Sequence, residues 1–290
     1  MPSSHTEAAV FMNYTQRDLD DRVFNTQLHP PFLDDIISEF SERSAAAESA
    51  LKRQAFSYGA HPDQVVDFFP TQHKDAPTFI FIHGGAWHKY SRKFGAFLAP
   101  AFINHGINFA ALGFSLLPAA RLPEIVRQVR EGIAFVYHNT SQGGSSPEIY
   151  LSGHSSGAHL AALALCTDWS THRLSNQFIK GGLCISGLYD LRPVILSKNF
   201  PSLQISENEE KDLTPLNLAS KMIAGVTLAY AENDPIEAPR QARDFHAALL
   251  AQGKSSQLVE VPDCNHWSIL RSLADPQGTL FQCAQSLINN

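Results

Sequence analysis

Length, composition and charge place this chain among globular proteins and exclude several functions. Its 290 residues suit one large domain, and 44% hydrophobic residues suffice for a sizeable core. A net charge of −6 gives no basic excess for a nucleic-acid partner, and no apolar run is long enough to span a membrane. The first residues lack a signal-peptide pattern, and four widely spaced cysteines form no C-x-x-C pair, so we expect a cytoplasmic protein with reduced thiols.

The first 60 residues are predicted to form a helical segment. Thr15 is a suitable N-cap for a helix over 15–25, with Asp18 in the first turn, and two prolines follow its end. Apolar residues then recur at helical spacing between 34 and 56, which predicts a longer amphipathic helix there.

Beyond residue 60, short apolar runs alternate with amphipathic stretches. Strands are predicted over the apolar runs 65–69, 78–82, 107–112, 149–151, 179–186, 226–231 and 256–261. Helices are predicted after the turn at 153–157 and over 94–105, 122–139, 239–252, 267–274 and 280–288, with a loop at 143–147. This alternation predicts an α/β fold with a mostly parallel sheet and helices on both faces. Residues 188–220 interrupt it, and we expect a cap-like excursion over the site within a single domain, 1–290.

The turn Gly153-His154-Ser155-Ser156-Gly157 lies between a predicted strand and a predicted helix. A G-x-S-x-G sequence in this context is a nucleophile elbow, which holds a serine on a strained turn with its hydroxyl exposed. Glycine is needed at both ends, because a Cβ would collide where strand and helix pack closely. An ordinary glycine-rich loop is the alternative explanation of the five residues. With an elbow near its middle, the chain fits the α/β-hydrolase fold.

A serine hydroxyl needs a base to activate it, and the base needs an orienting acid. In this fold both follow the nucleophile along the chain, the acid first and the histidine second, each on a loop after a strand. Asp234 follows the strand 226–231, and His266 follows the strand 256–261. Ser155, Asp234 and His266 are therefore the predicted catalytic residues.

Other acidic and histidine residues lie near these positions. Glu232 is an alternative acid, Asp263 is better explained as a turn residue, and Asp234 itself could be a turn or N-cap residue. His154 and His159 flank the elbow without a carboxylate partner, so no metal site and no cofactor are predicted.

An acyl-transfer reaction also needs hydrogen-bond donors for the oxyanion of its intermediate. His83-Gly-Gly-Ala-Trp87 follows the strand 78–82, the place of the oxyanion loop in α/β-hydrolases. Paired glycines let the backbone turn its N–H groups inward. We assign the oxyanion hole to the amides of Gly84 and Gly85, with the Ser156 amide at the helix start as a third donor. A plain Gly-Gly turn is the alternative.

These motifs together resemble the serine-type arylformamidases (kynurenine formamidases) of the α/β-hydrolase superfamily. Four segments carry the resemblance: His83-Gly-Gly-Ala-Trp87 resembles that family's H-G-G-x-W, and 153–162, 232–241 and 265–267 resemble its elbow, acid loop and histidine loop. Residues 14–25 resemble a family opening that helps to cover the site. One departure is Gly113-Phe-Ser-Leu-Leu-Pro118 in place of D-Y-R-L-x-P, so Phe114 and Ser115 replace a Tyr and an Arg.

The resemblance implies hydrolysis of an N-formyl aryl amine such as N-formylkynurenine. The implied partner is a small, aromatic substrate, and a homodimer is an open alternative for the assembly. Candidate substrate-binding residues are Trp87, His83, His154 and Tyr90, although packing roles explain each of them as well. A carboxylesterase, or an amide or carbamate hydrolase, would use the same machinery, so selectivity depends on the shape of the pocket. A non-catalytic binding protein on a hydrolase fold is a more remote alternative.

Overall fold

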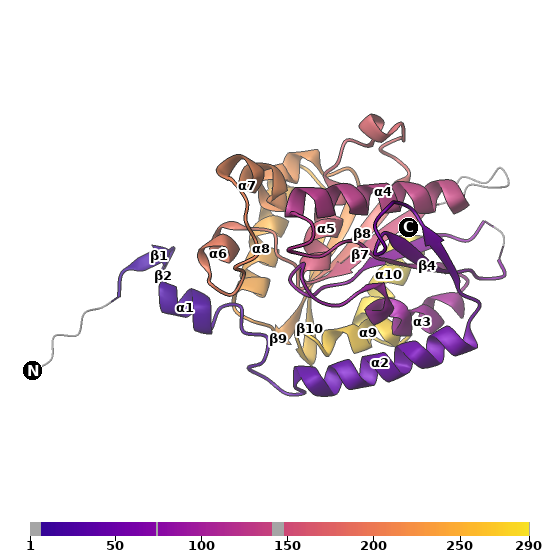
Figure 1. Ribbon diagram of the computed structural model, residues 1–290, viewed down its shortest axis with the longest axis horizontal. Coiled ribbons are helices and arrows are strands. Elements are labelled where there is room, and N and C mark those ends of the chain that lie inside the picture. The colour runs from indigo at the N-terminus through magenta and orange to yellow at the C-terminus, as the bar shows by residue number, and fades with distance from the viewer. Residues whose placement is uncertain (1–6, 74, 141–147, 290) are drawn as a thin grey trace, which may run out of the picture.

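A computed structural model describes residues 7–73, 75–140 and 148–289 (Figure 1). Its centre is an eight-stranded sheet in the order β10-β9-β8-β7-β5-β6-β4-β3. Neighbouring strands from β10 to β6 are parallel, whereas β4 pairs antiparallel with both β6 and β3. The strands are β3 (Gln54–Ser57), β4 (Val65–Phe69), β5 (Thr78–Ile82), β6 (Asn108–Leu112), β7 (Ile149–His154), β8 (Ile179–Ile185), β9 (Gly225–Asn233) and β10 (Ser256–Asn265).

Helices cover both faces of this sheet. Successive side chains of a strand point to opposite faces, and because the central strands are apolar on both, each face packs against a layer of helices. Ile80 and Ile82 of β5 belong to the core beneath α4, α5 and α8, while Phe79 and Phe81 belong to the core on the other face. The first face carries α4 (Leu122–Thr140), α5 (Ser156–Leu165) and α8 (Glu237–Ala251). The second carries α2 (Leu33–Ala50), the 3-10 helix η1 (Arg92–Leu98), α3 (Ala99–Ile103), α9 (Ile269–Ala274) and α10 (Thr279–Asn289). All four cysteines are free thiols.

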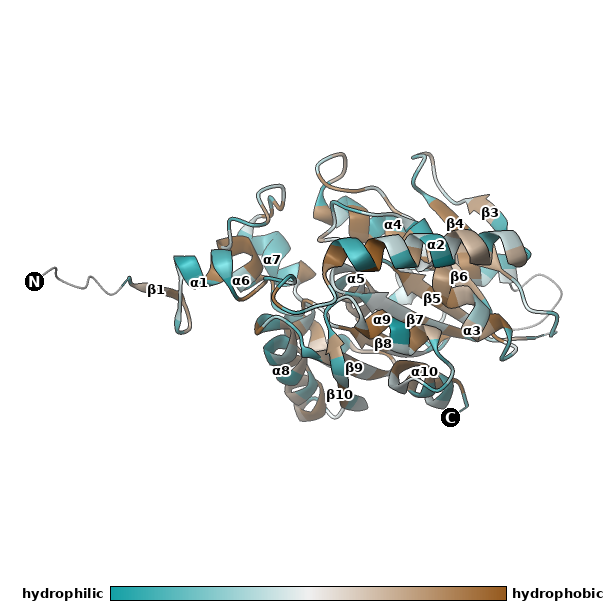
Figure 2. Ribbon diagram, turned by 90° about the horizontal axis from the view of Figure 1, so that it is seen from below, coloured by the Kyte–Doolittle hydropathy of each residue, from teal (hydrophilic) through white to brown (hydrophobic). Residues whose placement is uncertain are grey.

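The two segments outside this three-layer core meet at one end of the molecule. The hairpin β1 (Ala9–Phe11) and β2 (Tyr14–Thr15) leads into α1 (Gln16–Asp21), which lies beside α6 (Arg192–Leu196) (Figures 1 and 2). The excursion between β8 and β9 contributes α6, α7 (Glu207–Leu213) and η3 (Pro215–Lys221). Thr15 caps α1 in a reciprocal capping box with Asp18, as its sequence predicts.

Two helix predictions are wrong at their ends. The helix predicted over 15–25 ends at Asp21. The predicted helix over 34–56 stops at Ala50, and residues 54–57 form the edge strand β3 instead. Figure 2 shows the alternation of hydrophilic and hydrophobic residues around α2 that marks its buried face. Phe56 continues the helical spacing of apolar residues seen in α2, but it belongs to β3, where it pairs with Val66 of β4. Strands β1, β2 and β3 also mean that residues 1–60 are not purely helical, and the predicted loop at 143–147 lies outside the described residues.

Candidate active site

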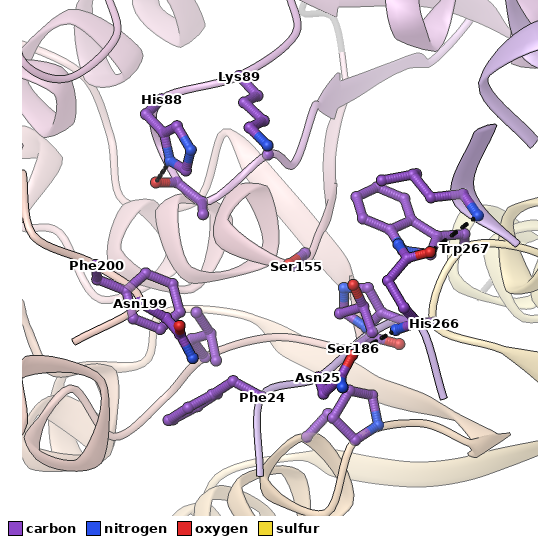
Figure 3. A pocket seen from close by; sticks show the side chains of 18 of the residues that line it. Phe24, Asn25, His88, Lys89, Ser155, Ser186, Asn199, Phe200, His266 and Trp267 are labelled. Carbon is purple, nitrogen blue, oxygen red and sulfur yellow. Dashed lines mark hydrogen bonds between the residues drawn. The ribbon is translucent and has the colours of Figure 1, made fainter. Parts of the chain in front are cut away.

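Ser155 occupies the turn between β7 and α5 in a strained conformation. Its φ of 55° and ψ of −122° lie in a region of backbone conformation that residues other than glycine rarely adopt. Strand and helix approach so closely that a Cβ on Gly153 would lie 2.2 Å from the Gly157 carbonyl oxygen, and a Cβ on Gly157 would lie 2.1 Å from that of Ile82. The steric requirement for both glycines is therefore confirmed, and Ser155 lines the adjoining cavity (Figure 3).

Asp234 and His266 lie together at the carboxyl ends of β9 and β10. The His266 Nδ1–H donates to Asp234 Oδ1 at 2.6 Å, and both side chains are almost fully buried. The second carboxylate oxygen, Oδ2, accepts from the Ala231 amide at 2.7 Å and from the Ser186 hydroxyl at 2.6 Å. Three hydrogen bonds thus orient this carboxylate and present Oδ1 to the imidazole.

Ser186, which no motif in the sequence singles out, also belongs to this site. It follows the end of β8 with a positive φ of 49°, and it lines the cavity next to Ser155. The available signal was its position, since residues just after parallel strands meet at the same edge of the sheet.

The alternative acids have other hydrogen-bond partners. Glu232 Oε2 accepts from the Asp263 amide at 2.8 Å, and Asp263 adopts a turn conformation with a φ of 55°. In the described part of the chain, neither carboxylate forms a hydrogen bond or ion pair with His266.

Ser155 and His266 face the same cavity of about 560 Å³ (Figure 3). Among the described residues, no hydrogen bond joins the Ser155 hydroxyl to the imidazole of His266. The cavity wall is rich in aromatic side chains, which come from the N-terminal segment, the oxyanion loop, the excursion and the histidine loop: Phe24, Tyr90, Phe200 and Trp267. Residues 20–21, 24–27 and 199–200 also line this cavity.

The predicted oxyanion loop makes a tight turn above the elbow. Gly85 has a φ of +110°, and a Cβ there would lie 2.3 Å from the Lys89 carbonyl oxygen, so this position requires glycine. Gly85 and Ala86 line the cavity, whereas Gly84 lies behind them against the His154 backbone. Among the hydrogen bonds of the described residues, none uses the backbone amide of Gly84, Gly85 or Ala86 as its donor. Ser156, the first residue of α5, accepts the Trp87 amide on its hydroxyl at 3.2 Å.

Of the four predicted substrate-binding residues, only Tyr90 lines the cavity. Trp87 and His83 are buried, and neither is part of the cavity wall in the described chain. The loop turns back after Gly85, which places the Trp87 ring edge-on against His159 in the core. The His83 ring stacks on Phe114 at 4.5 Å, and burial lowers its pKa to about 4.

His154 is also buried and outside the cavity wall, beneath the histidine loop. Its Nε2–H donates to the His266 carbonyl oxygen at 2.7 Å, and burial holds its pKa well below the ordinary value. The residue before Ser155 therefore supports the backbone of His266 rather than contacting a substrate.

Two further properties of the described residues bear on function. They contain no group of three or more His, Cys, Asp or Glu side chains placed to hold a metal ion. Within residues 7–73, 75–140 and 148–289, no helix combines the length and the apolar character needed to cross a membrane.

The sheet order, the elbow at Ser155 and the acid and histidine loops after β9 and β10 define an α/β-hydrolase. An esterase from Pyrobaculum calidifontis has the same fold, with a TM-score of 0.70 and 16% identity over 91% of this chain and 95% of that one. The BD-FAE family model matches residues 67–181.

Comparison with other sequences identifies the family within this class. The kynurenine formamidase of Salmo salar is 31% identical over 252 residues, which cover 85% of this chain and 84% of that protein. The isoprenylcysteine α-carbonyl methylesterase of Arabidopsis thaliana is 26% identical over 250 residues, or 77% of this chain and 58% of that protein. The chain belongs to the kynurenine formamidase family and is a hydrolase.

Proposed function

We propose that this protein hydrolyses an N-formyl aryl amide, such as N-formylkynurenine, to formate and the arylamine through an acyl-enzyme on Ser155. One observation carries the proposal: an elbow serine shares a cavity with a buried histidine whose Nδ1–H donates to an oriented carboxylate, Asp234. That combination supplies a nucleophile, a base and an orienting acid. The names of the relatives in Salmo salar and Danio rerio support the choice of the formyl group.

In the proposed reaction, the Ser155 oxygen attacks the formyl carbon while His266 Nε2 takes the hydroxyl proton. Asp234 keeps the other ring proton on Nδ1, so that Nε2 is free to accept. The imidazolium then gives its proton to the aryl nitrogen, the C–N bond breaks, and the arylamine leaves. Water activated by His266 attacks the formyl ester, and formate departs as the serine regains its proton.

The oxyanion is proposed to bind to backbone amides on two sides. Gly85 and Ala86 line the cavity and have amides without a hydrogen-bond acceptor in the described chain. The Ser156 amide adds a donor at the N-terminus of α5, where the partial positive charge of the helix favours an anion. Gly84, part of the sequence-based assignment, then acts by allowing the close approach to His154.

An aromatic substrate fits the wall of the cavity. Phe24, Phe200, Tyr90 and Trp267 offer ring faces and edges to an aryl group, and about 560 Å³ lies within the range of small-molecule sites. Because an aryl nitrogen is a better leaving group than an alkyl nitrogen, a serine hydrolase can cleave such an amide.

The test is a comparison of kcat/KM for N-formylkynurenine and for p-nitrophenyl acetate, with Ser155→Ala as the inactive control. We expect the formamide to be the better substrate and both activities to vanish in the variant. If only the ester is turned over, the formamidase assignment is wrong and the carboxylesterase is the function.

The carboxylesterase is the second candidate because of the methylesterase relative in Arabidopsis thaliana. A non-catalytic binding protein would leave Ser155 unlabelled by a fluorophosphonate probe, and we expect stoichiometric labelling. A cytoplasmic location and a homodimer are further proposals, which fractionation and light scattering test.

A further inference from the structure

The side chain of Asn265, next to His266, uses every hydrogen-bonding position that an amide has. Its oxygen accepts from the Trp267 amide at 3.0 Å and from the Ser268 amide at 2.9 Å. Its nitrogen donates to the His29 carbonyl oxygen at 2.6 Å and to that of Pro31 at 2.9 Å. Two acceptor and two donor positions are thus all satisfied in a side chain that is only 2% exposed.

The two carbonyl groups belong to a segment that forms part of the cavity wall. We call residues 24–32, between α1 and α2, the roof strap. Phe24, Asn25, Thr26 and Gln27 of the roof strap line the cavity that contains Ser155. Any substrate held in that cavity is therefore enclosed on one side by this segment.

Few bonds hold the roof strap to the rest of the protein. Within the described part of the chain, its hydrogen bonds to residues outside 21–36 are the two that Asn265 donates. The Phe24 ring adds an edge contact with Phe200, with ring centroids 5.5 Å apart. The preceding helix α1 is fastened separately, since Asp20 accepts from the Lys198 amide and its carbonyl accepts from Asn199.

We propose that Asn265 is a positioning residue that fastens the roof strap to the loop carrying His266, so that enclosure of the substrate depends on one side chain. Only a primary amide can accept from two loop amides and donate to two strap carbonyl groups at once. A carboxylate or a hydroxyl of similar size serves the loop but not the strap. The substrate in this statement rests on the proposed function, whereas the attachment of the strap does not.

Two variants separate the two sides of the amide. Asn265→Asp keeps both acceptor positions for Trp267 and Ser268 and turns a carboxylate toward the strap carbonyl groups. Asn265→Ser keeps a short acceptor of the kind that caps helices and introduces no charge. Ser268→Ala is the matched control. It removes the hydroxyl that accepts from the backbone N–H of Asn265, and it leaves both hydrogen bonds from the Asn265 side chain to the strap in place.

Hydrogen–deuterium exchange measures the attachment directly. We expect exchange across residues 24–32 to rise about tenfold or more in both Asn265 variants and to stay at the wild-type level in Ser268→Ala. Unchanged strap exchange in the two Asn265 variants would overturn the proposal. Since the two variants differ in charge, agreement between them also excludes charge repulsion as the cause.

Kinetics measure the consequence for the substrate. We expect KM for N-formylkynurenine to rise about tenfold in both Asn265 variants. Because p-nitrophenyl acetate is too small to depend on contacts with the roof strap, its kcat/KM should change less than about threefold. Equal losses on both substrates, or a freed strap with unchanged kinetics, would show that Asn265 is only structural. If the wild type does not cleave N-formylkynurenine, the proposed function fails, and 1-naphthyl acetate replaces it as the large substrate.

Discussion

Replacing Asp234 with Asn should reverse the tautomer of His266, because the surroundings of the carboxylate fix the orientation of the new amide. At the Oδ2 position the Ala231 amide donates at 2.7 Å, and a backbone N–H cannot become an acceptor. The asparagine must therefore keep its oxygen there and turn its NH₂ group toward the imidazole. His266 Nδ1 then has to accept, the ring proton moves to Nε2, and Nε2 can no longer take the proton of Ser155.

The expected loss is large because the base, not only its orientation, is removed. In a Ser-His-Asp triad the corresponding change lowers kcat about 10⁴-fold, which corresponds to about 5 kcal/mol of transition-state stabilisation. We expect the same decrease in kcat on p-nitrophenyl acetate and in the rate of fluorophosphonate labelling of Ser155, with an unchanged thermal midpoint.

Glu232→Gln is the control for the competing acid. Its side-chain oxygen can still accept from the Asp263 amide, so we expect activity within about threefold of wild type. An Asp234→Asn enzyme within about tenfold of wild type, or a large loss in Glu232→Gln, would refute this account of the acid.

Three further changes test other contacts. Ser186→Ala removes one of the two hydrogen bonds to Asp234 Oδ2. Because a hydrogen bond to a charged group is worth about 1.5–3 kcal/mol, kcat should fall about 10- to 100-fold. An unchanged kcat would show that the hydrogen bond is dispensable. Gly157→Ala would place its Cβ 2.1 Å from a carbonyl oxygen of β5 and should lower the free energy of unfolding in urea by about 3 kcal/mol or more; full stability would show that the elbow can relax. Burial lowers the pKa of His83 and of His159 from 6.5 to about 4, so the unfolded chain takes up protons first as pH falls. Stability should therefore decrease between pH 6.5 and 4 in urea titrations, and less steeply in His159→Gln; equal slopes would contradict this source of the pH dependence.

Local patterns in the sequence were enough to predict the fold and the order of the elements that carry the site. A strand of period two, a helix of period 3.6 and a Gly-x-Ser-x-Gly turn are each decided by residues within a few positions of one another. The glycines at 153 and 157 are required by atoms of the turn and of β5, and the capping box of Thr15 and Asp18 spans three residues. The helix prediction for 54–56 failed where a more distant segment, the strand β4, decided the conformation.

The residues that line the cavity could not be predicted in this way. Trp87, His83 and His154 have the same local pattern whether they face a substrate or the core, and only the path of the loop after Gly85 and the packing beneath His266 decide between the two. Ser186 meets Asp234 across 48 residues, and Asn265 meets Pro31 across 234. The fold and the chemical groups available to the site follow from short-range sterics and periodicity, which can be recognised in the sequence. Which of those groups meet depends on contacts between distant segments, and these arise only when the whole chain packs.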